Sequence, residues 1–268
     1  MRRPGLDRDG FIEREGSLER VPPAFGPVVD AAKSAIVGAF GPDRLHSAYL
    51  YGSIPRGTAV PGVSDLDAML VLRDEPAPAD RIAATALEDT LNGQLPQING
   101  AGIGLASAAT ILSDLERHDL GWFVACLCTP LIGEDLAARL PRYRPTSLLA
   151  RETNGDLGDL LPRWREALGE TSAAADRRTL SRRIGRRLVR TGFTLVMPRW
   201  NGWTSDLDES AAVFGRYYPA RREQMRVATT VARTLPADPA VLDMLVNDLG
   251  PWLAAEYLTV HGRKAPRS

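Results

Sequence analysis

The sequence predicts an α+β protein, in which a mixed sheet with flanking helices is followed by an all-helical C-terminal domain. Short β-rich segments alternate with helical patterns up to about residue 145, and strand patterns are scarce beyond it. The chain has 268 residues, 44% of them hydrophobic and 25% charged, which is enough for one large domain or two ordinary ones. We expect a flexible arm over residues 1–22, a sheet domain over 23–145, a helical domain over 146–262 and a tail over 263–268.

The sheet domain begins with a helical pattern. The stretch "FGPVVDAAKSAIVGAF", residues 25–40, carries apolar residues at helical spacing and is followed by Gly41 and Pro42, which favour a helix end. Strands are expected over residues 45–53, 65–72 and 100–110, where β-formers or small apolar residues are bounded by glycine and polar residues. Further helices are expected over 79–95, with Asp80 as N-cap, and over 134–141, ending at Pro141.

The second half of the chain carries helical patterns with little else. They cover residues 148–170, 175–197, 205–219, 220–235 and 239–262. Asp206 is the expected N-cap of the third of these, because Glu209 stands three residues later in the capping-box position. Residues 143–147 read as a linker, and a cleft between the two domains is the default place for a ligand.

The charge and cysteine content exclude several classes of protein. The chain has 33 basic and 33 acidic residues, so its net charge of zero argues against a nucleic-acid or membrane partner. The charged N-terminus has no apolar segment of a secretory signal, and no apolar run approaches the roughly 20 residues of a membrane helix. Cys126 and Cys128 read as reduced core thiols, which favours a cytoplasmic location.

Two aspartates stand two residues apart on an expected buried strand. In "YGSIPRGTAVPGVSDLDAMLV", residues 51–71, the side-chain period of two places Asp65 and Asp67 on one face. Two like charges so close together are unfavourable unless a cation lies between them. Hard divalent ions such as Mg²⁺ bind in this way and commonly bring nucleotide phosphates as further ligands. The pair therefore predicts a metal site and candidate catalytic residues.

The residues before this pair fit a phosphate site. Gly52 follows a strand and permits close backbone approach, and Ser53 can open a helical turn whose N–H groups and hydroxyl hold a phosphate. Arg56 is the nearby cation, and Ser64 adds a second hydroxyl. We expect all four residues to contribute to nucleotide binding.

This Gly-Ser, Arg-Gly, Ser and Asp-x-Asp pattern resembles the signature of the nucleotidyltransferase superfamily named after DNA polymerase beta. It is most similar to the small-substrate branch that holds the antibiotic nucleotidyltransferases, and "CTPLIGEDLAARLP", residues 128–141, resembles the end of the nucleotidyltransferase domain there. The resemblance covers residues 30–145 and implies a nucleotidyltransferase-like sheet. It also implies transfer of a nucleoside monophosphate from ATP, or another nucleoside triphosphate, to a hydroxyl of a small acceptor. Asp65 and Asp67 would hold Mg²⁺.

The chain departs from that family on the third strand, where a further carboxylate is usual. "GAGIGLASAATI", residues 100–111, contains no acid, and Gly104 or Ala106 stands where one is expected. The base could come from elsewhere, or two carboxylates could support slow transfer, or the chain could bind nucleotide as a regulatory protein without transferring it. The acids considered are Glu88, Asp89, Asp114, Glu116, Asp156, Asp159, Asp206, Asp208 and Glu209. A protein-modifying nucleotidyltransferase is a further alternative, disfavoured by the large helical domain.

Two features of the helical domain carry alternative interpretations. Arg183 and Arg187 share a helix face within "DRRTLSRRIGRRLVR", where they could clamp a triphosphate or form a solvated or acid-paired face. The aromatic residues Trp200, Trp203, Phe214, Tyr217 and Tyr218 could stack on a base or sugar, but core packing is the more common role of such residues.

Overall fold

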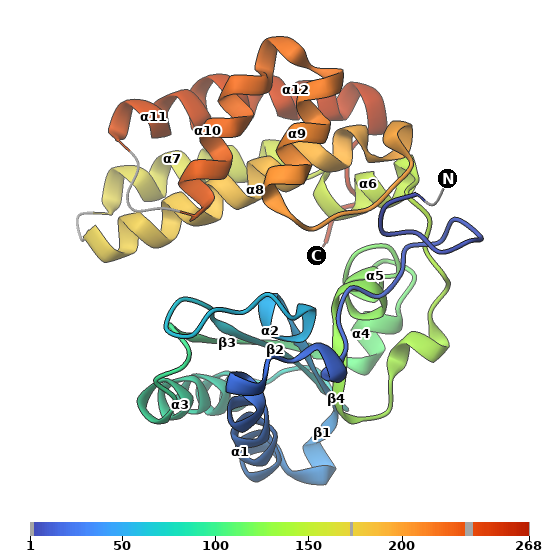
Figure 1. Ribbon diagram of the computed structural model, residues 1–268, viewed down its shortest axis with the longest axis vertical. Coiled ribbons are helices and arrows are strands. Elements are labelled where there is room, and N and C mark those ends of the chain that lie inside the picture. Colours follow the sequence, from blue (N-terminus) through green and yellow to red (C-terminus); the bar gives the residue numbers. More distant parts are fainter. Residues whose placement is uncertain (1–2, 172–173, 234–237, 268) are drawn as a thin grey trace. The chain divides into compact units, whose positions relative to one another are not determined.

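The computed structural model describes residues 3–171, 174–233 and 238–267. Contacts divide the chain into two compact units: Glu13–Tyr143, which we call the sheet unit, and Arg144–Ser268 together with Met1–Ile12, which we call the helical unit. In Figure 1 the sheet unit runs from blue to green, and the helical unit runs from yellow-green to red with the blue N-terminal residues up to Ile12 added. None of the described helices combines the length and apolar character that crossing a membrane requires.

The sheet unit is built on four strands in the order β3-β2-β1-β4. The strands are β1 (Leu45–Tyr51), β2 (Leu66–Leu72), β3 (Ala101–Ser107) and β4 (Thr129–Gly133). Strand β1 runs antiparallel to β2 and β4, whereas β2 and β3 are parallel. The sheet is therefore mixed, as the sequence predicts, and the three strands expected from the pattern are confirmed.

Two helices cover one face of this sheet. Helix α1 (Gly26–Arg44) and helix α3 (Pro78–Gln94) pack with the strands into a large apolar core that includes Ile36, Leu70 and Leu87 (Figure 1). Gly41 breaks the helical geometry of α1 with φ 63° and ψ 170°, at the place where the sequence predicts the helix end. Because β2 and β3 are parallel, α3 serves as the crossover between them.

The opposite face of the sheet is covered only in part. Tyr49, Met69 and Val71 pack there against α4 (Ala108–Leu112) and the segment formed by α5 (Leu120–Trp122) and a π-helical turn, Phe123–Leu127. Cys126 and Cys128 are buried and unpaired, as predicted, and burial raises the pKa of Cys126 to about 12. The expected helix over 134–141 is a single 3₁₀ turn, Leu136–Arg139.

The N-terminal arm is not the loose segment that the sequence suggests. Leu6 and Ile12 form a β-bridge and are both buried, and the Trp203 N–H donates to the Pro4 carbonyl at 2.9 Å within the helical unit. Beyond the unit boundary, Arg14 donates to both carboxylate oxygens of Asp135, at 2.8 and 3.1 Å. Pro4 and Arg14 of the arm find partners far along the chain, Trp203 and Asp135, which a local pattern does not reveal.

The helical unit contains seven α-helices among its described residues. They are α6 (Ser147–Asn154), α7 (Leu157–Glu170), α8 (Ala174–Trp200), α9 (Leu207–Tyr217), α10 (Arg222–Arg233), α11 (Pro239–Met244) and α12 (Gly250–His261). The all-helical C-terminal region is thus confirmed, although the pattern over 148–170 forms two helices separated near Gly155. Asp206 caps α9 as predicted, because its carboxylate accepts the Glu209 N–H at 2.9 Å.

The C-terminal tail also differs from its expected disorder. Arg267 lies 3.0 Å from the carboxylate of the buried Glu152, and Lys264 lies 3.8 Å from that of Asp156. Glu152 also pairs with Arg151 and Asp156 with Arg187, so Arg267 and Lys264 add to these ion pairs and connect the tail to α6 and to the start of α7.

Asp80 has a different role from the predicted one, and that role leads to a pH-dependent prediction. It is the third residue of α3 rather than its N-cap, and its carboxylate accepts the Ala77 N–H at 2.7 Å and the Arg44 Nε–H at 2.9 Å. The hydrogen bond with Arg44 lowers the pKa of Asp80 below 3.8. Its stabilisation is therefore fully present above the ordinary carboxyl pKa of the unfolded chain and is lost as the pH falls through the lower folded-state pKa.

Asp80→Asn should lower the free energy of unfolding by about 1 kcal/mol at pH 7, because one charged hydrogen bond is lost. The difference from the wild type should shrink in acid, as measured by urea unfolding at pH 7 and pH 3. Asp74 is the matched control, since it also lies near Arg44, at 3.3 Å, but its side chain is 85% exposed. Asp74→Asn should change stability by less than about 0.5 kcal/mol, and an equal loss in both variants would contradict the assignment.

Candidate active site

The two aspartates lie on one face of the sheet, next to two glycines at the start of β3. Asp67 is paired in register with Gly102 on the parallel strand β3. A Cβ atom at Gly100 would lie 3.6 Å from Asp65 Oδ1, and one at Gly102 would lie 3.7 Å from Asp67 Oδ1. Because Gly100 and Gly102 are two residues apart, the structure brings both carboxylates to the same face, as the side-chain period predicts.

Gly52 closes this group from the side of β1. It has φ 83° and ψ −150°, and a Cβ there would lie 2.6 Å from Asp67 Oδ2. This backbone conformation is essentially restricted to glycine. Ser53 then opens the short helix α2 (Ser53–Arg56), which ends at Gly57 in the left-handed conformation. The strand, glycine and helical turn that the sequence predicts are therefore present, beside the second aspartate.

Arg56 and Ser64 have structural partners in this loop. The Arg56 Nε–H donates to the Gly52 carbonyl at 2.9 Å, and its Nη1 lies 3.5 Å from the Glu15 carboxylate. The Ser64 hydroxyl accepts the Val60 N–H at 2.9 Å. Both residues thus shape the loop between β1 and β2, and their predicted phosphate contacts stay predictions.

A third acid does not join the aspartates within the described part of the chain. Among the residues that the structure describes, no group of three or more His, Cys, Asp or Glu side chains is placed to hold a metal ion. Met69 covers Gly104, where a Cβ would meet the Met69 Cε at 2.9 Å, and Ala106 is buried. Gly104 and Ala106 are paired in register with Met69 and Val71, so Gly102, rather than either position considered in the sequence, is the β3 residue opposite Asp67.

The nearby acids of the sheet unit are used elsewhere or lie apart from the pair. Glu88 reaches the edge of β3 and accepts the Ile103 N–H at 2.6 Å. Asp114 forms an ion pair with Arg117, Asp89 is exposed on α3, and Glu116 is buried.

The acids considered in the helical unit have partners within it. Asp156 is bonded to Arg187, Asp159 lies 3.2 Å from Arg263, and Asp208 lies 2.6 Å from Arg233. Asp206 caps α9 by accepting the backbone N–H of Glu209. These contacts account for Asp156, Asp159, Asp206 and Asp208 as structural groups.

The two predicted arginines of α8 differ in environment. Arg183 is exposed, whereas Arg187 is half-buried and donates to Asp156. The Arg187 Nε is buried and makes no hydrogen bond with the described residues. Acid pairing, one of the two interpretations left open by the sequence, therefore applies to Arg187, and a phosphate contact of Arg183 stays a prediction.

Core packing accounts for much of the aromatic group. Trp203 and Phe214 are buried, and Phe193 meets Trp200 and Trp203 edge-on at 5.7 and 5.6 Å between ring centroids. Tyr218 stacks on Phe214 and donates its hydroxyl proton to Glu256 at 2.8 Å. These contacts are those of a helical core, the more common role of such residues.

Asn99 is a neighbour of the pair that no sequence pattern indicates. It lies in the loop before β3, and its Nδ2 is 3.5 Å from Asp65 Oδ1. The residues are 34 positions apart, so no spacing motif connects them. Only the parallel pairing of β2 with β3 brings them together.

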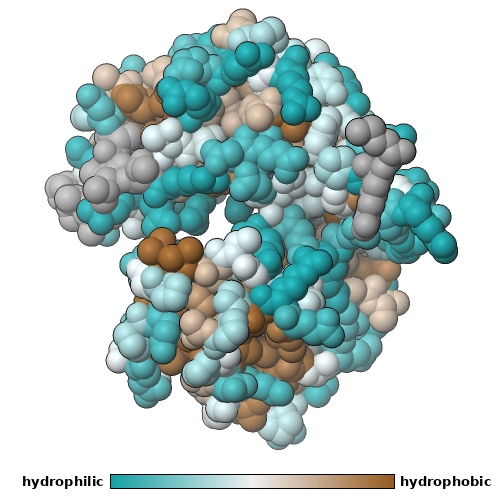
Figure 2. All heavy atoms as spheres, in the orientation of Figure 1, coloured by the Kyte–Doolittle hydropathy of each residue, from teal (hydrophilic) through white to brown (hydrophobic). Residues whose placement is uncertain are grey.

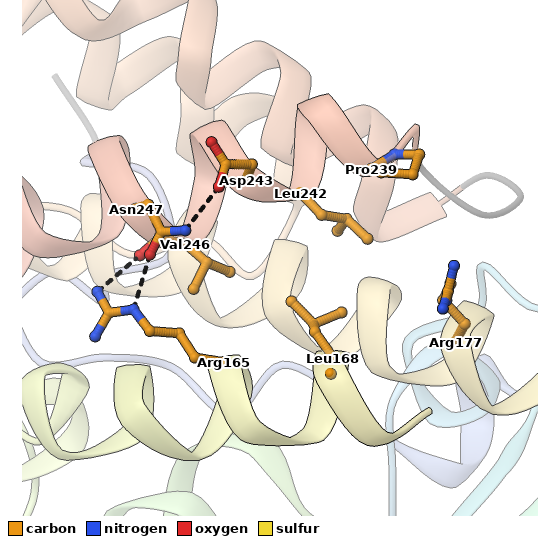
Figure 3. A pocket seen from close by; sticks show the side chains of 9 residues that line it. Arg165, Leu168, Arg177, Pro239, Leu242, Asp243, Val246 and Asn247 are labelled. Carbon is orange, nitrogen blue, oxygen red and sulfur yellow. Dashed lines mark hydrogen bonds between the residues drawn. The ribbon is translucent and has the colours of Figure 1, made fainter. Parts of the chain in front are cut away.

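A pocket of about 330 Å³ lies within the helical unit and contains none of the predicted site residues. Figure 3 shows Arg165 and Asn247 at one end and Arg177 at the other, with Leu168 and Leu242 between them. The Arg165 Nε–H donates to Asn247 Oδ1 and the Asn247 Nδ2–H to Asp243 Oδ1, both at 2.8 Å. These hydrogen bonds join α7 to α11 and the segment that follows it, and they pair the polar side chains at that end of the pocket with one another.

Most residues of the loop over 57–64, which directly precedes Asp65, are exposed. Val60 and Val63 are 53% and 64% exposed there. Figure 2 shows such hydrophobic side chains as separate patches among hydrophilic ones on the visible face.

Comparison with known proteins supports the fold. No protein-family model and no curated protein matches the chain. Among solved structures, spectinomycin adenyltransferase AAD(9) from Enterococcus faecialis, solved with ATP and spectinomycin, matches with a TM-score of 0.53 and 14% identity. The match covers 86% of this chain and 98% of that one. The nucleotidyltransferase-like fold is thereby confirmed, as is the resemblance in fold to an antibiotic-modifying nucleotidyltransferase.

Proposed function

We propose that this chain is a Mg²⁺-dependent nucleotidyltransferase that transfers a nucleoside monophosphate from a nucleoside triphosphate, with ATP favoured, to a hydroxyl of a small acceptor. The observation that carries this proposal is the contact of Asp67 with the Gly52 turn, with Asp65 on the same face. The fold shared with an adenyltransferase solved with ATP and spectinomycin supports the reaction class.

The residues of the site fit a divalent cation. Asp65 and Asp67 offer hard carboxylate oxygens. Gly100 and Gly102, which lie beside them, have no side chains that would occupy the space next to the carboxylates. When bound, Mg²⁺ would neutralise the charge of the triphosphate and of the departing pyrophosphate. Gly52 would allow the phosphates to approach the backbone, and Ser53 would hold them through its hydroxyl and N–H.

The proposed reaction breaks the phosphoanhydride bond between the α- and β-phosphates and forms a phosphate ester with the acceptor. The acceptor oxygen bonds to the α-phosphorus, the bond from that phosphorus to pyrophosphate breaks, and the hydroxyl proton passes to water. Positioning and charge neutralisation supply most of the rate in such transfers. With no third acid among the described residues at the pair, we expect turnover to be slow and to rise with the acidity of the acceptor hydroxyl.

The assay for this function is release of pyrophosphate. Purified protein is incubated with Mg²⁺, each nucleoside triphosphate and a panel of hydroxyl-bearing small molecules that includes aminocyclitols and aminoglycosides. We expect release that requires an acceptor, and a product heavier by one nucleoside monophosphate in mass spectrometry. Release that never exceeds the background of the Asp65→Asn protein would contradict the proposal.

A second candidate is a nucleotide-binding regulatory protein without transferase activity. It is favoured by the glycine at position 102, in register with Asp67, where a Cβ would make only an ordinary contact with Asp67 Oδ1 and the chain carries no acid. This protein would bind Mg²⁺-nucleotide with a dissociation constant that Asp65→Asn weakens, and would release no pyrophosphate with any acceptor. Calorimetry alongside the assay above separates the two.

A further inference from the structure

We propose that the side-chain amide of Asn99 is a third oxygen ligand of the cation held by Asp65 and Asp67. This inference rests on the proposed function, because it concerns the same metal site. The metal would then be bound by two carboxylates and one neutral carboxamide, drawn from Asp67 on β2, from Asp65 just before β2 and from the loop before β3. Carboxamide oxygens are ordinary ligands of hard divalent cations.

Distance is the first argument. The Asn99 Nδ2 lies 3.5 Å from Asp65 Oδ1. Neighbouring ligand oxygens of one octahedral Mg²⁺ are about 3 Å apart, since each lies roughly 2.1 Å from the ion. The oxygen and nitrogen of an asparagine amide exchange places by a half-turn of the side chain, so either can face a neighbour. Asn99 therefore needs only that rotation and a small shift to present its oxygen to a cation on Asp65.

The backbone fixes this loop against the metal-binding strand. The Asn99 N–H donates to the Ser64 carbonyl at 3.0 Å, and the Leu66 N–H donates to the Gly100 carbonyl at 2.8 Å. These two bonds flank Asp65 on both sides. Asn99 is thus held in place by its main chain while its side chain stays exposed, which is the arrangement that a ligand needs to reach an ion.

Charge gives the site a distinctive property. An amide contributes no charge and accepts no proton near neutral pH, so Asn99 would raise metal affinity without acting as a base. The site would carry two negative charges rather than three, and divalent affinity depends on that count. The inference therefore explains how a pair of carboxylates could hold a metal while the base expected from the family stays absent.

Mn²⁺ binding to the full-length protein, measured by electron paramagnetic resonance without nucleotide or acceptor, tests the assignment. Asn99→Ala should weaken Mn²⁺ binding about tenfold, and Asn99→Asp should tighten it about tenfold by adding a charge. Asn92→Ala is the matched control, because Asn92 is an exposed asparagine on α3 and should bind Mn²⁺ like the wild type. Thermal unfolding without metal verifies that each variant is folded.

The outcomes separate this inference from the proposed function. If Mn²⁺ binding depends on Asp65 but is unchanged in Asn99→Ala, Asn99 is only a hydrogen-bond donor to Asp65 and the inference is overturned. If Asp65→Asn binds Mn²⁺ like the wild type, the metal site itself is wrong and both proposals fail. Weakening by Asn99→Ala together with tightening by Asn99→Asp would support the carboxamide ligand.

Discussion

Asp65→Asn should reduce Mg²⁺-dependent pyrophosphate release by roughly a thousandfold while leaving the fold intact. The carboxamide keeps the shape of the side chain but removes one of the two charges that the proposed metal site offers. Loss of about 4 kcal/mol of transition-state stabilisation corresponds to that factor. Steady-state kinetics with saturating acceptor and nucleotide would measure it.

Stability distinguishes this effect from simple misfolding. Asp65 is partly exposed. The substitution removes a weak contact with Asn99 but also removes the charge repulsion with Asp67, and these two effects oppose each other. The free energy of unfolding should therefore stay within about 0.5 kcal/mol of the wild type. Asp89→Asn is the matched control, since Asp89 is an exposed acid of α3 and should keep full activity. Turnover of the Asp65 variant at the wild-type rate would remove the basis of the metal-assisted mechanism.

The sequence predicts those parts of the fold that local patterns encode. Helical spacing ending at Gly41 indicates α1, the β-rich run before Gly52 indicates β1, and Asp206 with Glu209 marks the start of α9. Each of these signals lies within a few residues of the element that it defines. Asp65 and Asp67, the candidate metal ligands, are predicted to share a face for the same reason, because they are close together in the sequence.

Features that depend on distant pairing are not predicted. Strand β4 lies in the uniformly apolar run over 120–133, which has no periodicity to separate helix from strand. Glu15 and Arg56 meet across 41 residues, so local patterns alone make the arm look loose. The parallel register of β2 and β3 places Gly102, rather than Gly104 or Ala106, opposite Asp67. No property of either strand alone specifies that register.

Gly52→Ala should both destabilise the protein and impair metal binding. At φ 83° and ψ −150° an alanine is strained, and its Cβ would lie 2.6 Å from Asp67 Oδ2. Alanine also lowers the conformational entropy of the unfolded chain, which would offset this loss of stability by at most about 1 kcal/mol. We therefore expect a net loss of about 2 to 3 kcal/mol in the free energy of unfolding, measured by urea denaturation.

The effect on metal binding follows from which atom must move. The carboxylate of Asp67 is on a short side chain of a buried strand, so it can avoid the new methyl group only by leaving the position proposed for the metal. Gly62→Ala is the control that separates this displacement from backbone strain. Gly62 also has a positive φ, of 72°, but a Cβ added there would meet no atom within 4 Å apart from its chain neighbours. This control variant should lose about 1 kcal/mol of stability and retain Mn²⁺ affinity, whereas Gly52→Ala should weaken that affinity at least tenfold. Equal Mn²⁺ affinity in the two variants would mean that close packing of Gly52 against Asp67 does not position the carboxylate for a metal.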